Sequence, residues 1–364
     1  MSFKCALIGL PNVGKSTLFN SLTNSSVSSD NFPFCTINPN VGIVSYHDKR
    51  LYNIAKIVCP QKVSPSSIEF VDVAGLVKGA HKGEGLGNKF LNNIRETDAL
   101  IHVVRCFTDK KILHVSGKID PISDIETVNL ELIFSDIERC KKFLSKRHVH
   151  SSNKFSNSLE TNVLTKCLLH LEKFNMLKNF IFTNEENNIL KQFNFLTIKP
   201  LMYVVNMNEH DFLKENSLFN QILLIAKKNN ISVIPLCFTL EFDISKMKLL
   251  KERREFIKDL NIKEQGLNKV IREGYKMLNL FTYFTMGKKE VKAWTITKGM
   301  TAPEAASKIH SDLKKGFIRA KVISYLDFIS YKSEIKLKKL GKVYTQGKNY
   351  IVQDGDIINF LFNI

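Results

Sequence analysis

Short apolar runs alternate with amphipathic segments along much of the chain. Strands separated by helical segments indicate an α/β protein, with a parallel sheet and helices on both faces. From Gly75 to Asn206 is 131 positions, about twice what two further strand–helix units need. The sequence therefore predicts an insertion between these positions. The apolar runs that we interpret as strands cover residues 3–8, 68–71, 99–106 and 200–205.

The inserted segment has helical periodicity. Between Thr127 and Leu144 apolar residues recur at 3-4-3-4 spacing, and a second seam runs from Val163 through Phe174 to Leu177. The polar stretch SKRHVHSSNKFSNS joins the two seams. This pattern favours a helical hairpin or short coiled coil, and an ordinary helical pair packed on the core is the alternative.

From about Leu278 the pattern becomes that of an α+β module. Thr301 and Glu304 form a capping box, which should open a helix that reaches about Leu313. Strands are predicted at 291–296, 318–325, 350–352 and 357–362. The predicted division is therefore a nucleotide-binding domain over 1–125 and 199–277, an inserted helical domain over 126–198, and a C-terminal domain over 278–364.

The loop after the first strand carries the clearest chemical signal. Residues 9–16 read GLPNVGKS, which is G-x-x-x-x-G-K-S between a strand and a helix. In such a loop the backbone N–H groups cradle phosphates, Lys15 reaches the β- and γ-phosphates, and the Ser16 hydroxyl binds Mg²⁺. Asp72, at the end of its strand, matches the acid that holds Mg²⁺ through water, and Gly75 lets the backbone approach the γ-phosphate. The sequence predicts a P-loop NTPase.

Other positions should complete the metal shell and position the attacking water. Thr36, in FPFCTINPN, lies where a switch threonine would bind the metal. Leu76 stands where many small GTPases place the glutamine that orients water, and leucine cannot hydrogen-bond to water. Either intrinsic turnover is slow, or another group enters the site. His114 and His81 are the candidates, and a solvated surface role is the alternative for a lone loop histidine.

The stretch NMNE, residues 206–209, stands where a GTP-binding protein carries Asn-Lys-X-Asp. That aspartate accepts hydrogen bonds from N1–H and the 2-amino group of guanine. Here it is replaced by Glu209, and the lysine by Met207. Adenine has neither of those donors, so this change removes the guanine readout and favours ATP. The alternative is that Glu209 still reads guanine from a shifted backbone.

The charge of the chain favours a polyanionic partner such as nucleic acid, because the net charge is +18 and the pI is about 9.5. Genomic drift toward A and T, which enriches Lys, Asn and Ile, is the alternative explanation. The seven cysteines are scattered without metal-type spacing, which predicts reduced thiols. Neither a signal peptide nor an apolar run of about 18 residues is present, so we expect a cytoplasmic protein without membrane contact.

Several segments together resemble the Obg-like ATPase (YchF) family over nearly the whole chain, namely GLPNVGKST, NFPFCTINPNVG, FVDVAGLVKGAHKGEGLGNKFLNNIRETDA, HVVRCF, NMNE, KGFIRAKVISYLDF and YIVQDGDIINFLFN. The resemblance implies a G domain of the Obg (TRAFAC) class with an inserted helical hairpin and a C-terminal TGS domain of the β-grasp type. It also implies a cytosolic ATPase that binds ribosomes. We expect the large subunit and its rRNA as partners, and a monomer.

The resemblance also assigns site residues. In Obg-related proteins the asparagine at position 12 can hold a monovalent cation, K⁺ here, against the phosphates, and a loop-shaping hydrogen bond is the alternative role. Mg²⁺ is expected on Ser16 and Thr36, and on Asp72 through water. ATP contacts are expected at Asn12, Val13, Gly14, Lys15, Ser16, Thr17, Asn206 and Met207.

Two classes of function follow. The first is a nucleotide-dependent switch in translation or stress regulation, in which ATP orders residues 30–40 and 72–90 and hydrolysis releases them. Among enzymes, the alternative to an ATPase is a GTPase of the Obg class. The second is an RNA- or ribosome-binding module whose nucleotide is structural.

Overall fold

The computed structural model divides by its contacts into two compact units. The larger unit comprises Lys4–Gly42 and Glu69–Val270, and the smaller unit comprises Met1–Phe3, Ile43–Ile68 and Ile271–Ile364. The structure describes residues 3–25, 40–73, 75, 79, 86–109, 112–115, 117–150, 159–212, 216–247, 249–260, 262 and 264–363.

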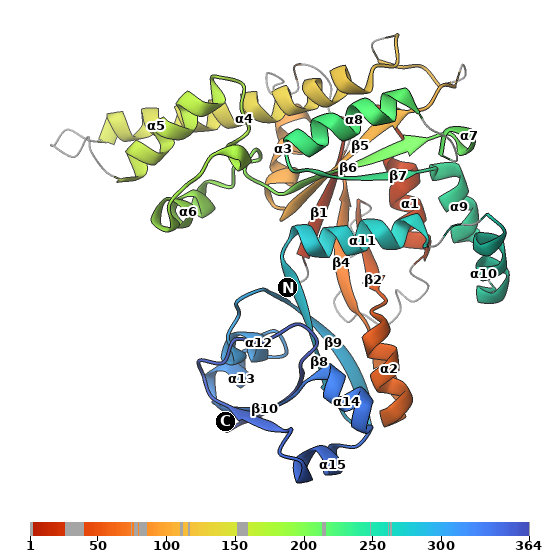
Figure 1. Ribbon diagram of the computed structural model, residues 1–364. Helices are drawn as coiled ribbons and strands as arrows, with labels where there is room; N and C mark the ends of the chain where they lie inside the picture. The colour runs from red at the N-terminus through yellow and green to blue at the C-terminus, as the bar shows by residue number, and fades with distance from the viewer. Residues whose placement is uncertain are drawn as a thin grey trace. The chain divides into compact units, whose positions relative to one another are not determined.

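A six-stranded sheet has the strand order β2-β4-β1-β5-β6-β7 (Figure 1). The pairs β1–β5, β5–β6 and β6–β7 are parallel. Every residue of β5 and β6 is buried, as expected for central strands that are covered on both faces. The α/β prediction is confirmed. The strand bounds are β1 Phe3–Ile8, β2 Val41–Tyr46, β4 Ser66–Asp72, β5 Ala99–Cys106, β6 Leu201–Met207 and β7 Ser232–Leu236.

The strand register brings the carboxyl ends of the parallel strands to one edge. Cys106 of β5 is level with Met207 of β6, and Asn206 is level with Leu236 of β7. Open α/β sheets bind their ligands at this edge. The helices of the larger unit are α1 Lys15–Ser25, α3 Leu86–Arg95, α4 Pro121–His150, α5 Leu159–Leu171, α6 Asn184–Leu190, α7 Glu209–Phe212, α8 Ser217–Lys228, α9 Phe238–Lys246 and α10 Leu250–Asp259, and α11 Gly266–Met277 follows across the boundary.

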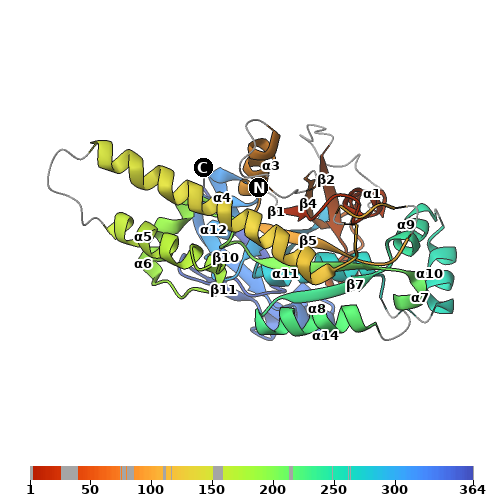
Figure 2. The ribbon, with the colours of Figure 1, turned by 90° about the horizontal axis from the view of Figure 1, so that it is seen from above.

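Helices α4 and α5, over which the two predicted helical seams begin, lie side by side (Figures 1 and 2). Ile133 and Cys140 of the first seam are buried in α4, and Val163 and Cys167 of the second are buried in α5. The second seam ends earlier than the sequence predicted, because α5 stops at Leu171. Phe174 then lies in a left-handed turn and is 59% exposed, so its assignment to the seam was wrong.

A buried ion pair ties α3 to α4. Nη1 of Arg95 donates to Oδ1 of Asp136 at 2.8 Å, and Nη2 donates to the Ser135 hydroxyl at 2.7 Å. The other oxygen of Asp136 accepts two hydrogen bonds from Thr197, from its N–H and its hydroxyl, each at 2.8 Å. Asp136 is fully buried, so this network compensates the desolvation of both charges.

The smaller unit contains a second six-stranded sheet, with the order β11-β10-β12-β8-β9-β3. It is mixed, since β12 pairs with β8 in parallel while β8–β9 and β10–β12 are antiparallel. The edge strand β3 comes from far upstream and pairs with β9. The elements are α2 Lys49–Val58, β3 Lys62–Ser64, β8 Leu280–Met286, β9 Glu290–Thr297, α12 Ala302–Ser307, α13 Ser311–Lys315, β10 Phe317–Ile323, α14 Tyr325–Tyr331, α15 Glu334–Lys339, β11 Tyr344–Gln346 and β12 Ile357–Phe362.

Successive residues of β8 pack into two different cores. Tyr283 packs with Ala305 of α12, whereas Phe284 packs with Leu51 of α2 and Phe328 of α14. Because neighbouring strand residues point to opposite faces, helices cover both faces of this sheet.

Two predictions in the C-terminal part were wrong. Residues 350–352 form no strand, and only an isolated bridge joins Ile351 to Thr301. The Asp356 carboxylate explains this, because it holds the segment in a turn by accepting from the Gln353 N–H and the Tyr350 hydroxyl. The helix after the capping box ends at Ser307 rather than near residue 313. His310 is extended, with φ −158°, and starts a separate helix by capping the N–H of Asp312.

Within the described ranges, no helix combines the length and apolarity needed to cross a membrane. The six cysteines in these ranges are free thiols.

Candidate nucleotide site

The loop between β1 and α1 needs glycine at two positions. Gly9 has φ +146° and Gly14 has φ +101°, a region of backbone conformation that favours glycine. A Cβ on Gly9 would lie 2.5 Å from the carbonyl oxygen of Val103, and one on Gly14 would lie 2.7 Å from the Phe238 ring. The sequence therefore folds into a tight loop whose N–H groups, with the start of α1, can surround an anion.

Lys15 is the buried cation of this loop. Its ammonium donates to the carbonyl oxygens of Leu10 at 2.7 Å and Gly9 at 3.2 Å, and the residue is only 7% exposed. Burial lowers the pKa of Lys15 to about 8, against the opposing effect of the nearby Asp72 carboxylate. A phosphate would supply the negative charge that this buried ammonium lacks.

We expect nucleoside triphosphate binding to weaken as the pH rises from 7 to 9. Above its pKa of about 8 Lys15 loses its proton, and a neutral amine does not attract phosphate, so the Kd should rise by up to about tenfold per pH unit. Titration of a fluorescent nucleotide at both pH values measures the change. Lys15→Arg is the control, because arginine stays charged in this range and should remove the pH dependence. An unchanged Kd between pH 7 and pH 9 in the unmodified chain would contradict the assignment.

Ser16 and Asp72 provide groups for a metal ion. The Ser16 hydroxyl donates to Oδ2 of Asp72 at 3.1 Å. Oδ1 of Asp72 is buried and has no hydrogen-bond partner among the described residues, and burial raises the pKa of this carboxyl. A hydrated cation would satisfy that oxygen. In the described part of the chain no group of three or more His, Cys, Asp or Glu could hold a metal ion.

The expected switch segments are described only in part. Thr36, Leu76 and His81 lie outside the described residues. Gly75 lies against the P-loop, where a Cβ would be 2.8 Å from the Pro11 backbone nitrogen. The N–H of Gly79 donates to the carboxylate of Glu131 in α4 at 2.6 Å.

The stretch 206–209 continues β6 into α7. Nδ2 of Asn206 donates to the carbonyl oxygen of Val13 at 3.1 Å, and its Oδ1 accepts from the N–H of Phe238 at 3.3 Å. This amide therefore joins the P-loop to the first residue of α9. Met207 is buried, whereas Glu209 is exposed in the first turn of α7.

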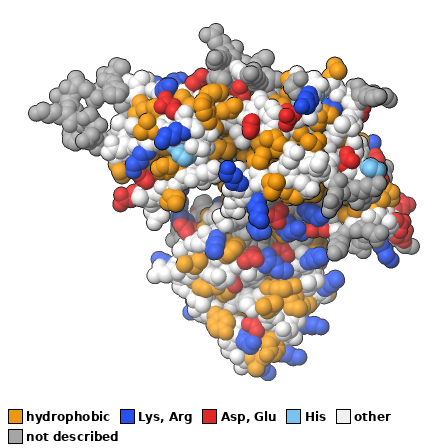
Figure 3. Space-filling model, turned by 45° about the horizontal axis from the view of Figure 1, so that its top comes forward, with side chains coloured by type: hydrophobic (Ala, Val, Ile, Leu, Met, Phe, Trp, Pro, Cys, Tyr) orange, Lys and Arg blue, Asp and Glu red, His pale blue; other side chains and the backbone are white. Residues whose placement is uncertain are grey.

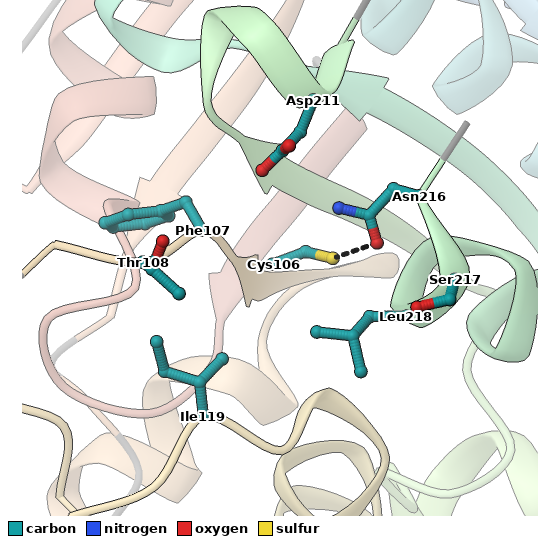
Figure 4. Close-up of a pocket in the computed structure, with 8 residues that line it drawn as sticks. All are labelled: Cys106, Phe107, Thr108, Ile119, Asp211, Asn216, Ser217 and Leu218. Atoms are coloured by element: carbon teal, nitrogen blue, oxygen red, sulfur yellow. Dashed lines mark hydrogen bonds between the residues drawn. The ribbon is translucent and has the colours of Figure 1, made fainter. Parts of the chain in front are cut away.

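A cavity of about 280 Å³ lies at the carboxyl ends of β5 and β6 (Figure 4). Phe107 and Thr108 line one side, Asp211 and Asn216 line the other, and the Cys106 thiol between them donates to Oδ1 of Asn216.

Two aromatic residues at this edge of the sheet were not predicted from the sequence. Phe107 directly follows β5 and stacks under the guanidinium of Arg105 at 4.4 Å, and Phe238 follows the end of β7. A signal was available, because both come just after the carboxyl ends of parallel strands, where ligands bind.

Asn12 of the P-loop contacts the segment that contains His114. Asn12 has φ +62° and its Nδ2 donates to the carbonyl oxygen of Leu113 at 3.3 Å, so the residue before His114 contacts the P-loop. Nε2 of His114 lies 3.0 Å from a carboxylate oxygen of Asp124, and the imidazole is only 4% exposed. The solvated surface role is therefore wrong for this histidine. Its catalytic role stays a prediction, as do the nucleotide contacts of Val13, Gly14, Thr17 and Met207.

The parallel sheet, the glycine loop, Lys15 and the Ser16–Asp72 pair define a P-loop nucleotide-binding protein of the GTPase type. Residues 4–136 match the family model described as "50S ribosome-binding GTPase", and residues 280–363 match the model for the C-terminal part of YchF GTPases, described as a protein of unknown function.

Comparison with individual proteins identifies the family within this class of P-loop proteins. The chain is 52% identical to the ribosome-binding ATPase YchF of Shigella flexneri and 45% identical to that of Bacillus subtilis (strain 168), with 100% of each chain covered. The solved structure of the Schizosaccharomyces pombe YchF GTPase matches with a TM-score of 0.88 at 36% identity, covering 99% of this chain and 98% of that one. The chain belongs to the YchF family.

Proposed function

We propose that this protein is a ribosome-binding ATPase that uses Mg²⁺ and acts as a nucleotide-dependent switch. The relatives support hydrolysis, but their names disagree about the base, since the bacterial relatives are named ATPases and the Schizosaccharomyces pombe protein a GTPase. Residues 206–209 are the reason for proposing ATP rather than GTP. Met207 replaces the lysine of the guanine motif, and the exposed Glu209 replaces its aspartate.

We expect Met207→Lys with Glu209→Asp to move the preference toward GTP. The restored aspartate supplies the carboxylate that accepts both hydrogen bonds from guanine, and a bidentate contact to a base is worth about 1–3 kcal/mol, or about 5- to 150-fold in relative affinity. Competition between ATP and GTP for a fluorescent nucleotide measures the ratio. The control is His210→Lys, which adds a positive charge on the same turn, where the His210 side chain is 72% exposed. A doubly substituted chain that keeps the ATP preference of the unmodified chain would refute this base readout.

The residues divide the chemistry as follows. The loop N–H groups and Lys15 bind and orient the phosphates. Ser16 and Thr36 hold Mg²⁺ directly, and Asp72 holds it through water. The metal ion supplies charge neutralisation at the β- and γ-phosphates when bound. Leu76 cannot orient water, so basal turnover is slow. His114 is the proposed group that enters the site, and its segment already contacts the P-loop through Leu113.

A monovalent ion is a further proposed cofactor. Asn12 lies in the P-loop in a left-handed conformation and is exposed. In this role the Asn12 side chain would hold K⁺ against the phosphates. The ion would supply the positive charge that an arginine finger otherwise provides. Its hydrogen bond to Leu113 supports the loop-shaping alternative. Equal turnover in potassium and sodium salts would remove Asn12 from the cation role.

The finer assignments rest on family membership and on the folds of the two units. We assign an Obg-class G domain to 1–125 and 199–277, the helical insert to 126–198, and a TGS domain of the β-grasp type to 278–364. The mixed sheet of the smaller unit, with helices on both faces, supports the last of these, although this unit also includes residues 43–68, which lie inside the range assigned to the G domain. The protein is proposed to act as a cytoplasmic monomer without membrane contact.

The smaller unit is the proposed main contact with the large ribosomal subunit and its rRNA, together with the helical insert. It contains 21 Lys and Arg against 9 Asp and Glu, so it carries +12 of the net charge of +18. Figure 3 shows these cations interspersed with hydrophobic side chains over the unit that contains β8 to β12. A lysine cluster lies on and beside α15, at Lys332, Lys336, Lys338, Lys339 and Lys342.

We expect ribosome binding to depend on salt and on this cluster. Each lost lysine contact should reduce the log–log salt slope by about 0.9 for duplex or 0.7 for single strands. Co-sedimentation with ribosomes should show a saturable complex that persists with Lys15→Ala and weakens with Lys336→Gln and Lys339→Gln. Neutralising Lys227 and Lys228 of α8, which are also exposed, is the matched control. Unsaturable binding that a generic polyanion competes away would contradict a specific ribosome complex, because nonspecific charge attraction would then account for the binding.

A further inference from the structure

The smaller unit contains a cleft of about 580 Å³ that the nucleotide chemistry does not use. This volume falls within the range of small-molecule and cofactor sites. Three tyrosines line it: Tyr325 at the start of α14, Tyr344 at the start of β11, and Tyr350. Most of its lining is apolar, and Arg50 from α2 and the turn 353–356 complete it.

Two of the three rings are held in place by their hydroxyl groups. The hydroxyl of Tyr325 accepts from Nδ2 of Asn53 at 2.9 Å, and that of Tyr350 donates to the Asp356 carboxylate at 2.7 Å. Tyr344 is 51% exposed, and its ring therefore offers an accessible apolar face. These contacts preorganise two of the three rings, which reduces the conformational entropy lost when a flat ligand stacks there.

The charges in the wall argue against a bare phosphate as the ligand. Arg50 is committed to two acids, donating to Asp48 at 2.7 Å and to Asp354 at 2.7 Å. Asp354 and Asp356 also line the cleft. The amides of Gln346 and Gln353 in the lining can donate to and accept from the edge of a ring. The cleft therefore suits a flat heterocycle, while the phosphates attached to it remain outside.

The surroundings of the cleft indicate what would carry that heterocycle. The unit has a net charge of +12, which attracts a polyanion. Unpaired RNA combines a charged backbone with bases that stack on aromatic side chains, whereas bases in a duplex are not accessible in this way. We propose that this cleft binds an unpaired base of single-stranded RNA. The proposal rests on the proposed ribosome binding and names the contact through which RNA is held.

Binding of a fluorescent, unstructured single-stranded RNA of about 12 nucleotides tests the proposal. Tyr344→Ala should weaken binding by the full-length protein about tenfold, the value expected for one lost stacking contact. Tyr344→Phe should bind like the unmodified chain, because it keeps the ring. Tyr331→Ala is the matched control, since Tyr331 is 37% exposed on the same unit but does not line the cleft.

The salt dependence separates stacking from charge. Tyr344→Ala should lower the affinity without changing the log–log salt slope, whereas Lys336→Gln should make that slope shallower. An unaffected Tyr344→Ala, or equal binding of a duplex of the same sequence, overturns the proposal. A Tyr344→Ala variant that loses ribosomes but keeps RNA affinity also overturns it, because the cleft would then bind a ribosomal protein. If the unmodified chain binds no ribosomes but shows the tyrosine effect on RNA, the proposed function fails and the cleft assignment stands.

Discussion

Lys15→Ala is expected to lower the rate of ATP turnover by about 10²- to 10³-fold or more, the effect of removing one preorganised donor to developing charge. Single-turnover phosphate release measures this rate. Lys15 is the buried ammonium of the P-loop, and its lowered pKa of about 8 shows that the folded chain pays a desolvation penalty to keep it charged.

The same penalty provides a control for folding. Removing a cation that burial disfavours should leave the thermal unfolding temperature unchanged or slightly raised. A variant that is stable but inactive therefore locates the defect in phosphate binding. Turnover within tenfold of the unmodified rate would show that Lys15 is not the phosphate-binding lysine.

Asp136→Ala is expected to destabilise the larger unit by about 3–5 kcal/mol, because it leaves Arg95 as a buried charge without its partner. Urea unfolding followed by circular dichroism gives this difference. The matched control is Glu172→Ala, which removes the Lys141–Glu172 pair between α4 and the residue after α5. That pair is exposed at both ends and should contribute only about 0–1 kcal/mol.

A double substitution tests the cause of the loss. Arg95→Met combined with Asp136→Leu removes both charges together, so it should recover much of the stability lost in Asp136→Ala. A loss below about 1 kcal/mol for Asp136→Ala would show that the network between α3 and α4 is not a strong structural link.

The P-loop could be predicted from sequence because its requirements are local. Eight consecutive residues between a strand and a helix supply the glycines, Lys15 and Ser16, and the tight contacts of Gly9 and Gly14 agree with that pattern. The central strands were equally clear, since fully buried parallel strands have near-continuous apolar runs, and β5 has the predicted bounds.

Features that depend on distant contacts could not be read in this way. Strand β3 is three residues long and pairs with β9 more than 200 residues later, and α2 packs its Leu51 into a core made by the C-terminal part. Residues 350–352 have a strand-like pattern, but Asp356 holds them in a turn. The local sequence pattern does not show which distant contacts form, or where such a contact overrides a local preference for a strand.

The candidate site shows the same limit. The sequence identified His114 but not its partner Asp124, whose carboxylate lies beside the imidazole and helps to enclose it. It placed Asn206 among the expected ATP contacts, whereas the structure commits its amide to Val13 and Phe238. A motif names the residues of a site, and the hydrogen bonds that each one already makes become visible only in the fold.

The most direct test of the proposed activity is a comparison of ATP and GTP on the unmodified protein with Mg²⁺ present, in which the Kd and the rate of phosphate release are measured for each nucleotide. We expect tighter binding of ATP, slow but measurable release of phosphate from it, and loss of that release in Lys15→Ala. Equal or tighter binding of GTP would contradict the base readout by Met207 and Glu209, and tight ATP binding without any phosphate release would make the nucleotide structural.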